Sequence, residues 1–379
     1  MFVLMDSRVD MIRELVCFIL CLFLLGCRDE PSSVVSEITF DLFTAKQMNM
    51  TEFVDSITLI PLETNDSSLI KSVETLNVAG DTIFVEERGN MMAFDKKGDF
   101  LYSTIHLQGG GPKDYYSGLD FISLSDGGLE VFDAVRSRLI KYDKDLQYVF
   151  SHKLAKEILP VSWCVYLFDD YRLLILKDEL KLYSLREDRI VSRIKVNGVP
   201  HFAFFNRNGL CMKNDEFFLS VYNQNFYYKL LLDNMDMKLE PVCKFDFGVE
   251  SNFDVMDLPM GESERFYMDY MRDNPRKAYV REKFVDAGKR MCFFIYDNKS
   301  YFAYQDEEKG INQVYYNVPM TRKQFLPANL YKDNIFYYAC EPQTLEYVVD
   351  ESLMSSDDVE KMSFVREDDN PIIVCYKLK

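Results

Sequence analysis

The stretch that decides the fold is DTIFVEERGNMMAFDKKGDFLYSTI, residues 81–105, in which short apolar runs alternate with polar turns. It predicts two strands, an acidic turn containing a glycine, and a further strand. The same order returns in GGLEVFDAVRSRLIKYDKDLQYVFSHKL, residues 127–154, and again in residues 171–195. An aromatic residue precedes each turn, and successive ones lie roughly 40 to 50 positions apart, a period typical of a four-stranded propeller blade. These residues are Phe94, Tyr142, Tyr183 and Tyr228.

Continued along the chain, the pattern predicts six blades, of which the last lacks one strand. The segment DSITLIPLE, residues 55–63, precedes the first complete blade and has alternating, β-branched character. We expect it to complete blade six and so close the ring, which removes two open sheet edges. Two charged stretches, at 262–284 and 343–362, predict short helical insertions, the first ending near Pro275. The predicted fold is an all-β, six-bladed propeller of four-stranded antiparallel blades.

Composition limits the classes of partner and of chemistry. The chain has 379 residues, 48% hydrophobic, with 61 acidic against 44 basic side chains and a net charge of −17. Because this charge would repel a phosphate backbone, we expect no nucleic-acid partner. Six cysteines follow Cys27, and none forms a CxxC pair. We expect small, buried free thiols, although an even count in an exported protein also allows disulfides.

The N-terminus has the features of an export signal. An apolar run from Leu15 to Gly26 is too short to span a bilayer, which is typical of a signal peptide over residues 1–26, and Met11 is an alternative start. The sequence LLGC resembles a bacterial lipobox, which implies lipidation of Cys27 and a membrane anchor. An ordinary signal peptide is the alternative. Polar residues 27–40 predict a flexible tether before a domain at 41–379, so removal of residues 28–50 is expected to be harmless.

The chain resembles the six-bladed β-propeller lipoproteins common in Bacteroidetes, which are distantly similar to NHL-repeat propellers. The resemblance covers roughly residues 36–379. It is carried by ITLIPLET, by FDKKGDFLYSTI, by the helical insertion after FDFG and by the ending EDDNPIIVCYKLK. It implies an outer-membrane lipoprotein at the cell surface, and the acidic pair after Cys27 resembles the export signal of such proteins; a periplasm-facing position is the alternative.

The glycine loop LQGGGPKDYYSGLDF, residues 107–121, raises the question of a phosphate site. A P-loop requires GxxxxGK followed by Ser or Thr and then a helix, and here a proline separates glycine from lysine and a strand follows. We therefore interpret the loop as structural. In the family that the chain resembles, this loop usually runs G-x-G-P-x-E-Y, and here Asp114 stands where glutamate is usual. Positive φ is expected at the glycines, a stiffened crossing at the proline, and an inter-blade plug at the tyrosine. The loop residues are Gly109, Gly111, Pro112, Asp114 and Tyr115.

No catalytic motif is present in the sequence. The three histidines, His106, His152 and His201, lie apart, and we assign no catalytic residue, no metal ligand and no cofactor. Trp163 is expected in the core. Two function classes remain: a surface-anchored, non-catalytic protein that binds a glycan, peptide or protein partner, or a metal-dependent propeller hydrolase or lyase with its site at the central channel.

Overall fold

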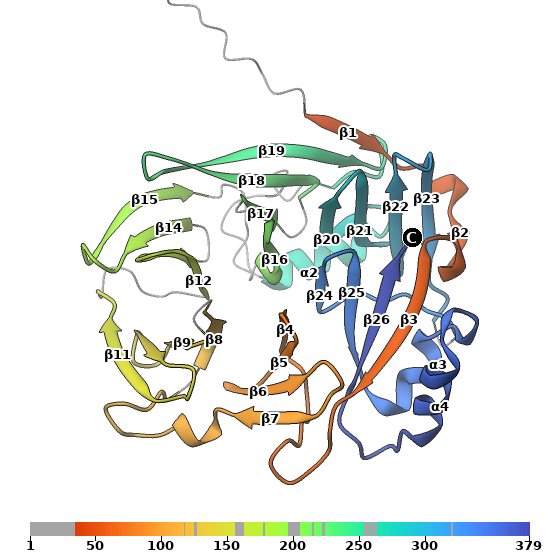
Figure 1. Ribbon diagram of the computed structural model, residues 1–379. Coiled ribbons are helices and arrows are strands. Elements are labelled where there is room, and N and C mark those ends of the chain that lie inside the picture. Colours follow the sequence, from red (N-terminus) through yellow and green to blue (C-terminus); the bar gives the residue numbers. More distant parts are fainter. Residues whose placement is uncertain are drawn as a thin grey trace, which may run out of the picture. The chain divides into compact units, whose positions relative to one another are not determined.

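Six antiparallel sheets stand in a ring in the computed structural model, so the protein is a six-bladed β-propeller (Figure 1). Each blade has four antiparallel strands, and two blades carry a fifth strand at the outer edge. The structure describes residues 35–116, 118–124, 127–155, 163–176, 179–195, 205–213, 216–221, 224–253, 258, 264–319 and 321–379. Residues 37–379 form one unit by their contacts.

The strands follow the chain from blade to blade. Blade one contains β4 to β7: Thr75–Ala79, Thr82–Glu87, Asn90–Asp95 and Phe100–Ser103. Blade two contains β8 to β11: Gly118–Ser123, Leu129–Asp133, Arg138–Tyr142 and Tyr148–Lys153. Blade three contains β12 to β15: Trp163–Phe168, Tyr171–Ile175, Glu179–Ser184 and Arg189–Lys195. Blade four contains β16 to β19: Phe205–Lys213, Glu216–Val221, Phe226–Asp233 and Asp236–Asp246. Blade five contains β20 to β23: Tyr279–Asp286, Lys289–Tyr296, Lys299–Asp306 and Ile311–Tyr316. Blade six contains β24, β25, β26 and β3: Leu330–Lys332, Ile335–Cys340, Ile372–Leu378 and Val54–Pro61.

The aromatic repeat marks the third strand of each of the first four blades, as the sequence predicts. Phe94, Tyr142 and Tyr183 are fully buried between blades, and Tyr228 is partly buried at the same position. An aspartate follows Phe94 and another follows Tyr142, and each stabilises the turn after it by hydrogen bonds. Asp95 Oδ1 accepts hydrogen bonds from the amides of residues 97 and 99, and Asp143 Oδ1 accepts from residues 145 and 147. The repeated aspartate therefore fixes the hairpin.

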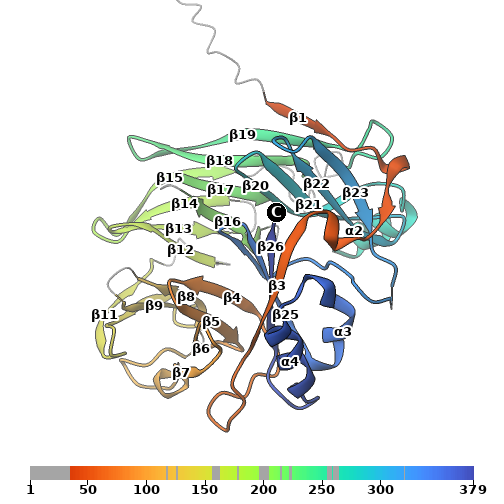
Figure 2. The same cartoon turned by 45° about the vertical axis from the view of Figure 1, so that its right-hand side comes forward.

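The ring is closed by the N-terminal strand, and this prediction is confirmed. β3 pairs antiparallel with β26, with Leu59 opposite Val374 and Ile60 opposite Ile373 (Figure 2). Ile57 and Leu59 pack in the aromatic-rich core between blades five and six, whereas Ile60 and Leu62 pack against blade one. Both faces of the strand are apolar because neighbouring blades cover both.

Gly98 lets blade one approach the closing strand. Its φ is +93°, which favours glycine, and a Cβ there would lie 2.0 Å from the carbonyl oxygen of Pro61. The chain after Pro61 then bonds to this turn, since the amide of Glu63 donates to the Gly98 oxygen at 2.8 Å. The glycine of the acidic turn is thus needed for ring closure as well as for the hairpin.

The segment before β3 covers the outer edges of two blades. β1 (Ser36–Thr39) is a fifth strand beside β19, and β2 (Lys46–Gln47) pairs in parallel with β23. Between and after them lie the 3-10 helices η1 (Leu42–Thr44) and η2 (Met50–Glu52). Ile38, Phe40 and Met50 are buried. The expectation that residues 28–50 are dispensable is therefore wrong, because part of this segment belongs to the apolar core.

Helical segments lie where the sequence predicts insertions. α2 (Glu264–Asp273) precedes blade five. Between β25 and β26 the chain forms η6 (Pro342–Thr344), α3 (Leu345–Val348), η7 (Glu351–Leu353) and α4 (Ser356–Phe364). A 3-10 helix η3 (Ile105–Leu107) follows β7. Within the part of the chain that the structure describes, no helix has both the length and the hydropathy needed to cross a bilayer.

The second insertion protects the free edge of β3. The amide of Leu59 donates to Asp358 Oδ1 at 3.1 Å, and Lys361 Nζ donates to the Leu59 oxygen at 3.1 Å. Met354, the residue that follows η7, forms an isolated parallel bridge with Ile57, two residues before Leu59 on β3. Side chains of α4 therefore take the place of a neighbouring strand, which prevents edge-to-edge association at this blade.

Candidate functional site

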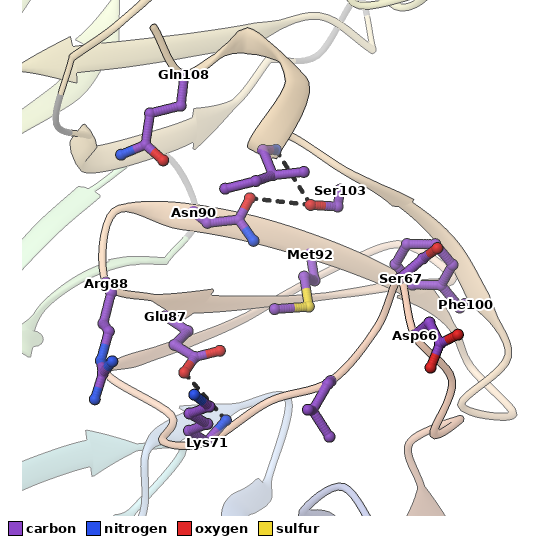
Figure 3. A pocket seen from close by; sticks show the side chains of 12 residues that line it. Asp66, Ser67, Lys71, Glu87, Arg88, Asn90, Met92, Phe100, Ser103 and Gln108 are labelled. Carbon is purple, nitrogen blue, oxygen red and sulfur yellow. Dashed lines mark hydrogen bonds between the residues drawn. The ribbon is translucent and has the colours of Figure 1, made fainter.

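A cavity of about 670 Å³ opens on blade one, between the β3–β4 connection and the end of β7 (Figure 3). Its volume lies within the range common for small-ligand sites, although it is broadly open to solvent. The floor is formed by Glu87, Asn90 and the buried thioether of Met92, and Leu69 and Ile105 lie on the rims. The other lining residues are Asp66, Ser67, Lys71, Arg88, Phe100, Ser103 and Gln108.

Hydrogen bonds hold the polar groups of the floor in place. Asn90 Oδ1 accepts from the hydroxyls of Ser103 at 3.0 Å and Thr104 at 3.1 Å. Glu87 Oε1 accepts from the backbone amide of Lys71 at 3.1 Å. The other polar atom of each side chain, Asn90 Nδ2 and Glu87 Oε2, points toward the cavity in Figure 3. A donor and an acceptor are therefore pre-positioned for a ligand.

Charge is distributed unevenly along the cavity. Arg88 and Lys71 are exposed beside Glu87, and Asp66 lies at the opposite end, near Phe100 (Figure 3). In a chain of net charge −17, this mixed lining avoids a uniformly acidic field. This lining would suit a molecule that is neutral or carries charges of both signs.

The glycine loop is filled by this chain's own arginines. Arg136 Nη1 donates to the carbonyl oxygens of Gly111 and Asp114, each at 3.1 Å, and Nη2 donates to that of Gly110 at 3.1 Å. Arg138 donates to the Pro112 oxygen at 2.9 Å and to the Asp114 oxygen. The loop therefore directs carbonyl oxygens toward guanidinium groups, whereas a phosphate would require amide groups.

Positive φ is not the reason for these glycines, and that expectation is wrong. The backbone of Gly109 and Gly111 lies outside the left-handed region. Instead, a Cβ on either residue would lie 2.6 or 2.7 Å from Asp114 Oδ2. This carboxylate accepts the amide of Gly111 at 2.8 Å. The shorter aspartate, where the family pattern has glutamate, fits inside the loop because the glycines leave it room.

Tyr115 is fully buried between blades one and two. It packs in a cluster with Met91 from blade one and Val131 and Ile140 from blade two. Its hydroxyl lies 2.9 Å from Thr104 Oγ1, and burial raises the pKa of Tyr115 to about 12. The tyrosine is therefore neutral at physiological pH and contributes packing and a hydrogen bond.

A second, smaller cavity of about 180 Å³ lies between blades two and three. Beside it is a buried ion pair: Arg172 Nε and Nη2 donate to Glu130 at 2.6 and 2.7 Å, with both side chains at most 5% exposed. The guanidinium also lies over the Tyr166 ring at 4.6 Å and donates to backbone oxygens. These contacts occupy the guanidinium group of Arg172. The ion pair therefore has a structural role, since it joins β9 of blade two to β13 of blade three.

The remaining predicted residues form no common site. His106 bonds to the Ser103 oxygen, and His152 lies between Tyr183 and Asp188 on another blade. Five cysteines are free and buried within the described ranges, and burial raises the pKa of Cys340 to about 11. Among described residues no three His, Cys, Asp or Glu side chains gather as metal ligands. Cys27, His201 and the side chain of Trp163 lie outside what the structure describes.

Comparison with known proteins places the fold in a family. The model of a domain of unknown function, DUF4934, matches residues 36–377. This chain belongs to the DUF4934 family. The match includes β1, β2 and the closing strand, so the DUF4934 domain contains the complete ring.

Solved structures resemble the DUF4934 propeller over most of its length. A Bacteroides fragilis protein named as a candidate exported protein is 16% identical, covers 91% of this chain and all of its own, and has a TM-score of 0.68. A DUF4221 family member from Bacteroides vulgatus is 10% identical, with coverage of 86% and 97% and a TM-score of 0.49. A search of curated proteins finds no match. At 16% identity, the likeness to the Bacteroides fragilis structure shows the fold alone.

Sequence reasoning missed the blade-one cavity. Its polar residues come from the β3–β4 connection, the β5–β6 hairpin, the end of β7 and the residue after η3, and no spacing or motif links them. Two weak signals were present: Ile105 is an apolar residue at the end of a predicted strand, and Arg88 precedes a glycine at a hairpin turn.

Proposed function

We propose that this DUF4934 propeller is a non-catalytic binding or scaffold lipoprotein of the outer membrane, exposed at the cell surface through a lipid on Cys27. It recognises a glycan, peptide or protein partner in the blade-one cavity. The observation that carries the proposal is the floor of that cavity, where Asn90 and Glu87 are fixed by hydrogen bonds and each directs one polar atom toward the open space (Figure 3).

Binding fits this arrangement better than catalysis. A catalytic site needs a nucleophile or a general base in contact with a second group that activates it. The cavity offers one buried carboxylate, whose bonded partner is a backbone amide, together with amide, hydroxyl and aliphatic groups and three exposed charged side chains, Asp66, Lys71 and Arg88. Such groups recognise a ligand by hydrogen bonds and apolar contact and leave its covalent bonds intact.

The binding proposal is tested with arrays of glycans and of peptides probed by the purified protein. Glu87→Gln keeps the shape and the acceptor for Lys71 but turns the free acceptor into a donor, so a true ligand should lose at least about tenfold in affinity. Asp81→Asn is the matched control, since Asp81 is 81% exposed in the β4–β5 turn. Equal affinity of the wild type, Glu87→Gln and Asp81→Asn for the ligand would show that the blade-one cavity is not the binding site.

The anchor is tested separately by lipid labelling in cells. Radiolabelled palmitate should enter the wild type and be absent from Cys27→Ser, because the lipobox-like LLGC supplies the acylated thiol. Equal labelling of the two proteins would overturn the lipoprotein assignment without affecting the binding proposal.

A further inference from the structure

The rims of the blade-one cavity are aliphatic and exposed. Leu69, on the β3–β4 connection, is 52% exposed, and Ile105, at the start of η3, is 55% exposed. Met92 lies beneath them on β6 and is buried. A branched aliphatic group placed between the rims would cover all three side chains and remove apolar surface from water.

The polar floor matches the backbone of one extended residue. Asn90 Nδ2 is a donor and Glu87 Oε2 is an acceptor, and both point toward the cavity in Figure 3. A residue in an extended chain presents its own N–H group and carbonyl oxygen on the same edge, which is the complement of this pair. The bonds from Ser103, Thr104 and the Lys71 amide orient the two side chains before a ligand arrives.

The cavity is poorly suited to a sugar ring. Sugar rings stack their C–H faces on flat aromatic surfaces, and Phe100 is the one aromatic residue among the twelve that line this cavity. Phe100 is only partly exposed and packs edge-on against Phe94, with centroids 5.7 Å apart and ring planes at 67°. The rims themselves, Leu69 and Ile105, offer no ring.

We propose that the cavity binds an extended peptide segment whose bulky aliphatic side chain sits between Leu69 and Ile105 and whose backbone bonds to Asn90 and Glu87. The inference rests on the proposed binding function and names its ligand class. The charges at the two ends, Asp66 and Arg88, suit a ligand without large net charge, which a short peptide satisfies.

The experiment follows the Met92 methyl group by NMR in protein labelled with carbon-13 at the methionine methyls. Comparison with Met92→Leu assigns the signal. Three probes are titrated to millimolar concentration: acetyl-Gly-Gly-Leu-Gly-Gly-amide, its all-glycine analogue, and cellotetraose. The leucine peptide should shift the Met92 signal, the glycine peptide should bind at least about tenfold more weakly, and cellotetraose should leave the signal unchanged.

Two variants connect the effect to the rims. Leu69→Asp should weaken binding of the leucine peptide by about tenfold or more, whereas Leu101→Asp should not, because Leu101 is 49% exposed on β7 and does not line the cavity. A shift with cellotetraose and none with the leucine peptide would overturn the peptide inference and leave the binding function standing. A Met92 signal that responds to no probe would overturn the peptide inference, and the array experiment then decides the binding function alone.

Discussion

At the scale of single residues, Gly111 and Gly110 give a matched pair. A Cβ at Gly111 would approach Asp114 Oδ2 to 2.7 Å, whereas Gly110 has no heavy atom within 4 Å of the same position. Gly111→Ala should therefore lose the Asp114 hydrogen bond and cost about 1 kcal/mol, while Gly110→Ala should be close to neutral. Thermal melting of both variants provides the measurement, and equal melting temperatures would contradict the role given to the carboxylate.

The Glu130–Arg172 pair predicts strong non-additivity. Arg172→Met leaves the Glu130 carboxylate buried without its cation, which should cost about 3–5 kcal/mol. The double variant Glu130→Leu, Arg172→Met removes both charges and should recover much of that loss, as measured by urea unfolding. If the loss of unfolding free energy in the double variant equals the sum of the losses in the two single variants, Glu130 and Arg172 are not energetically coupled.

Sequence patterns reach residues whose role is local. The aspartates that begin the β6–β7 and β10–β11 turns bond to amides two and four positions away, so the acidic turn could be recognised directly. Gly111 was also recognised as structural, but for the wrong reason, because its contact with Asp114 depends on how the loop folds around Arg136. Arg136 lies 25 residues farther along the chain, and no periodicity links the two.

At the scale of elements, α4 acts as a substitute strand for β3. Asp358 is almost completely buried, accepts the Leu59 amide and the Ser355 hydroxyl, and pairs with Lys361 at 2.8 Å. Asp358→Ala should lose about 1–2 kcal/mol at neutral pH. Asp357→Ala is the control, because Asp357 is exposed in the same first turn.

The effect of Asp358 should depend on pH. Burial opposes ionisation, but hydrogen bonds from Lys361, Ser355 and the Leu59 amide outweigh it, so the pKa of Asp358 is lowered. Because the pKa of Asp358 is lower in the native state than in the unfolded state, the ionised carboxylate stabilises the fold at pH values above the unfolded-state pKa of about 4. This contribution disappears as the pH falls through the native-state pKa. The stability difference between wild type and Asp358→Ala, measured by urea unfolding, should therefore narrow from pH 7 toward about pH 2. A difference that stays constant would show that the carboxylate's charge is irrelevant.

Elements could be predicted where the pattern is periodic. The third-strand aromatics and the apolar faces of β3 gave the blades and the closure. The short strands β1 and β2 were missed because four and two residues carry too little alternation, and their partners are blades four and five, distant in sequence. Tertiary contact decides whether so short a segment is a strand.

At the scale of the whole molecule, two truncations distinguish the closing strand from the segment before it. Deleting residues 28–64 removes β3 and should give aggregated or unfolded protein, because blade six loses its outer strand and blade one its apolar neighbour. Deleting residues 28–50 removes β1, β2 and Met50 but keeps β3, so the ring should still close with a clearly lower melting temperature. Gel filtration and thermal melting compare them, and a longer deletion that melts like the parent would refute the closure.

Closure by β3 also sets the order of events in folding. Lys379 Nζ donates to the Thr51 oxygen, 328 residues earlier, and β26 is the strand on which β3 must dock. Whether the polypeptide leaves a ribosome or an export channel, its first blade-six strand waits without a partner until nearly every other residue has emerged. Contacts so distant along the chain form slowly, and an exposed strand is prone to aggregate in the meantime. This early segment is therefore exposed to other chains until synthesis of the polypeptide is almost complete.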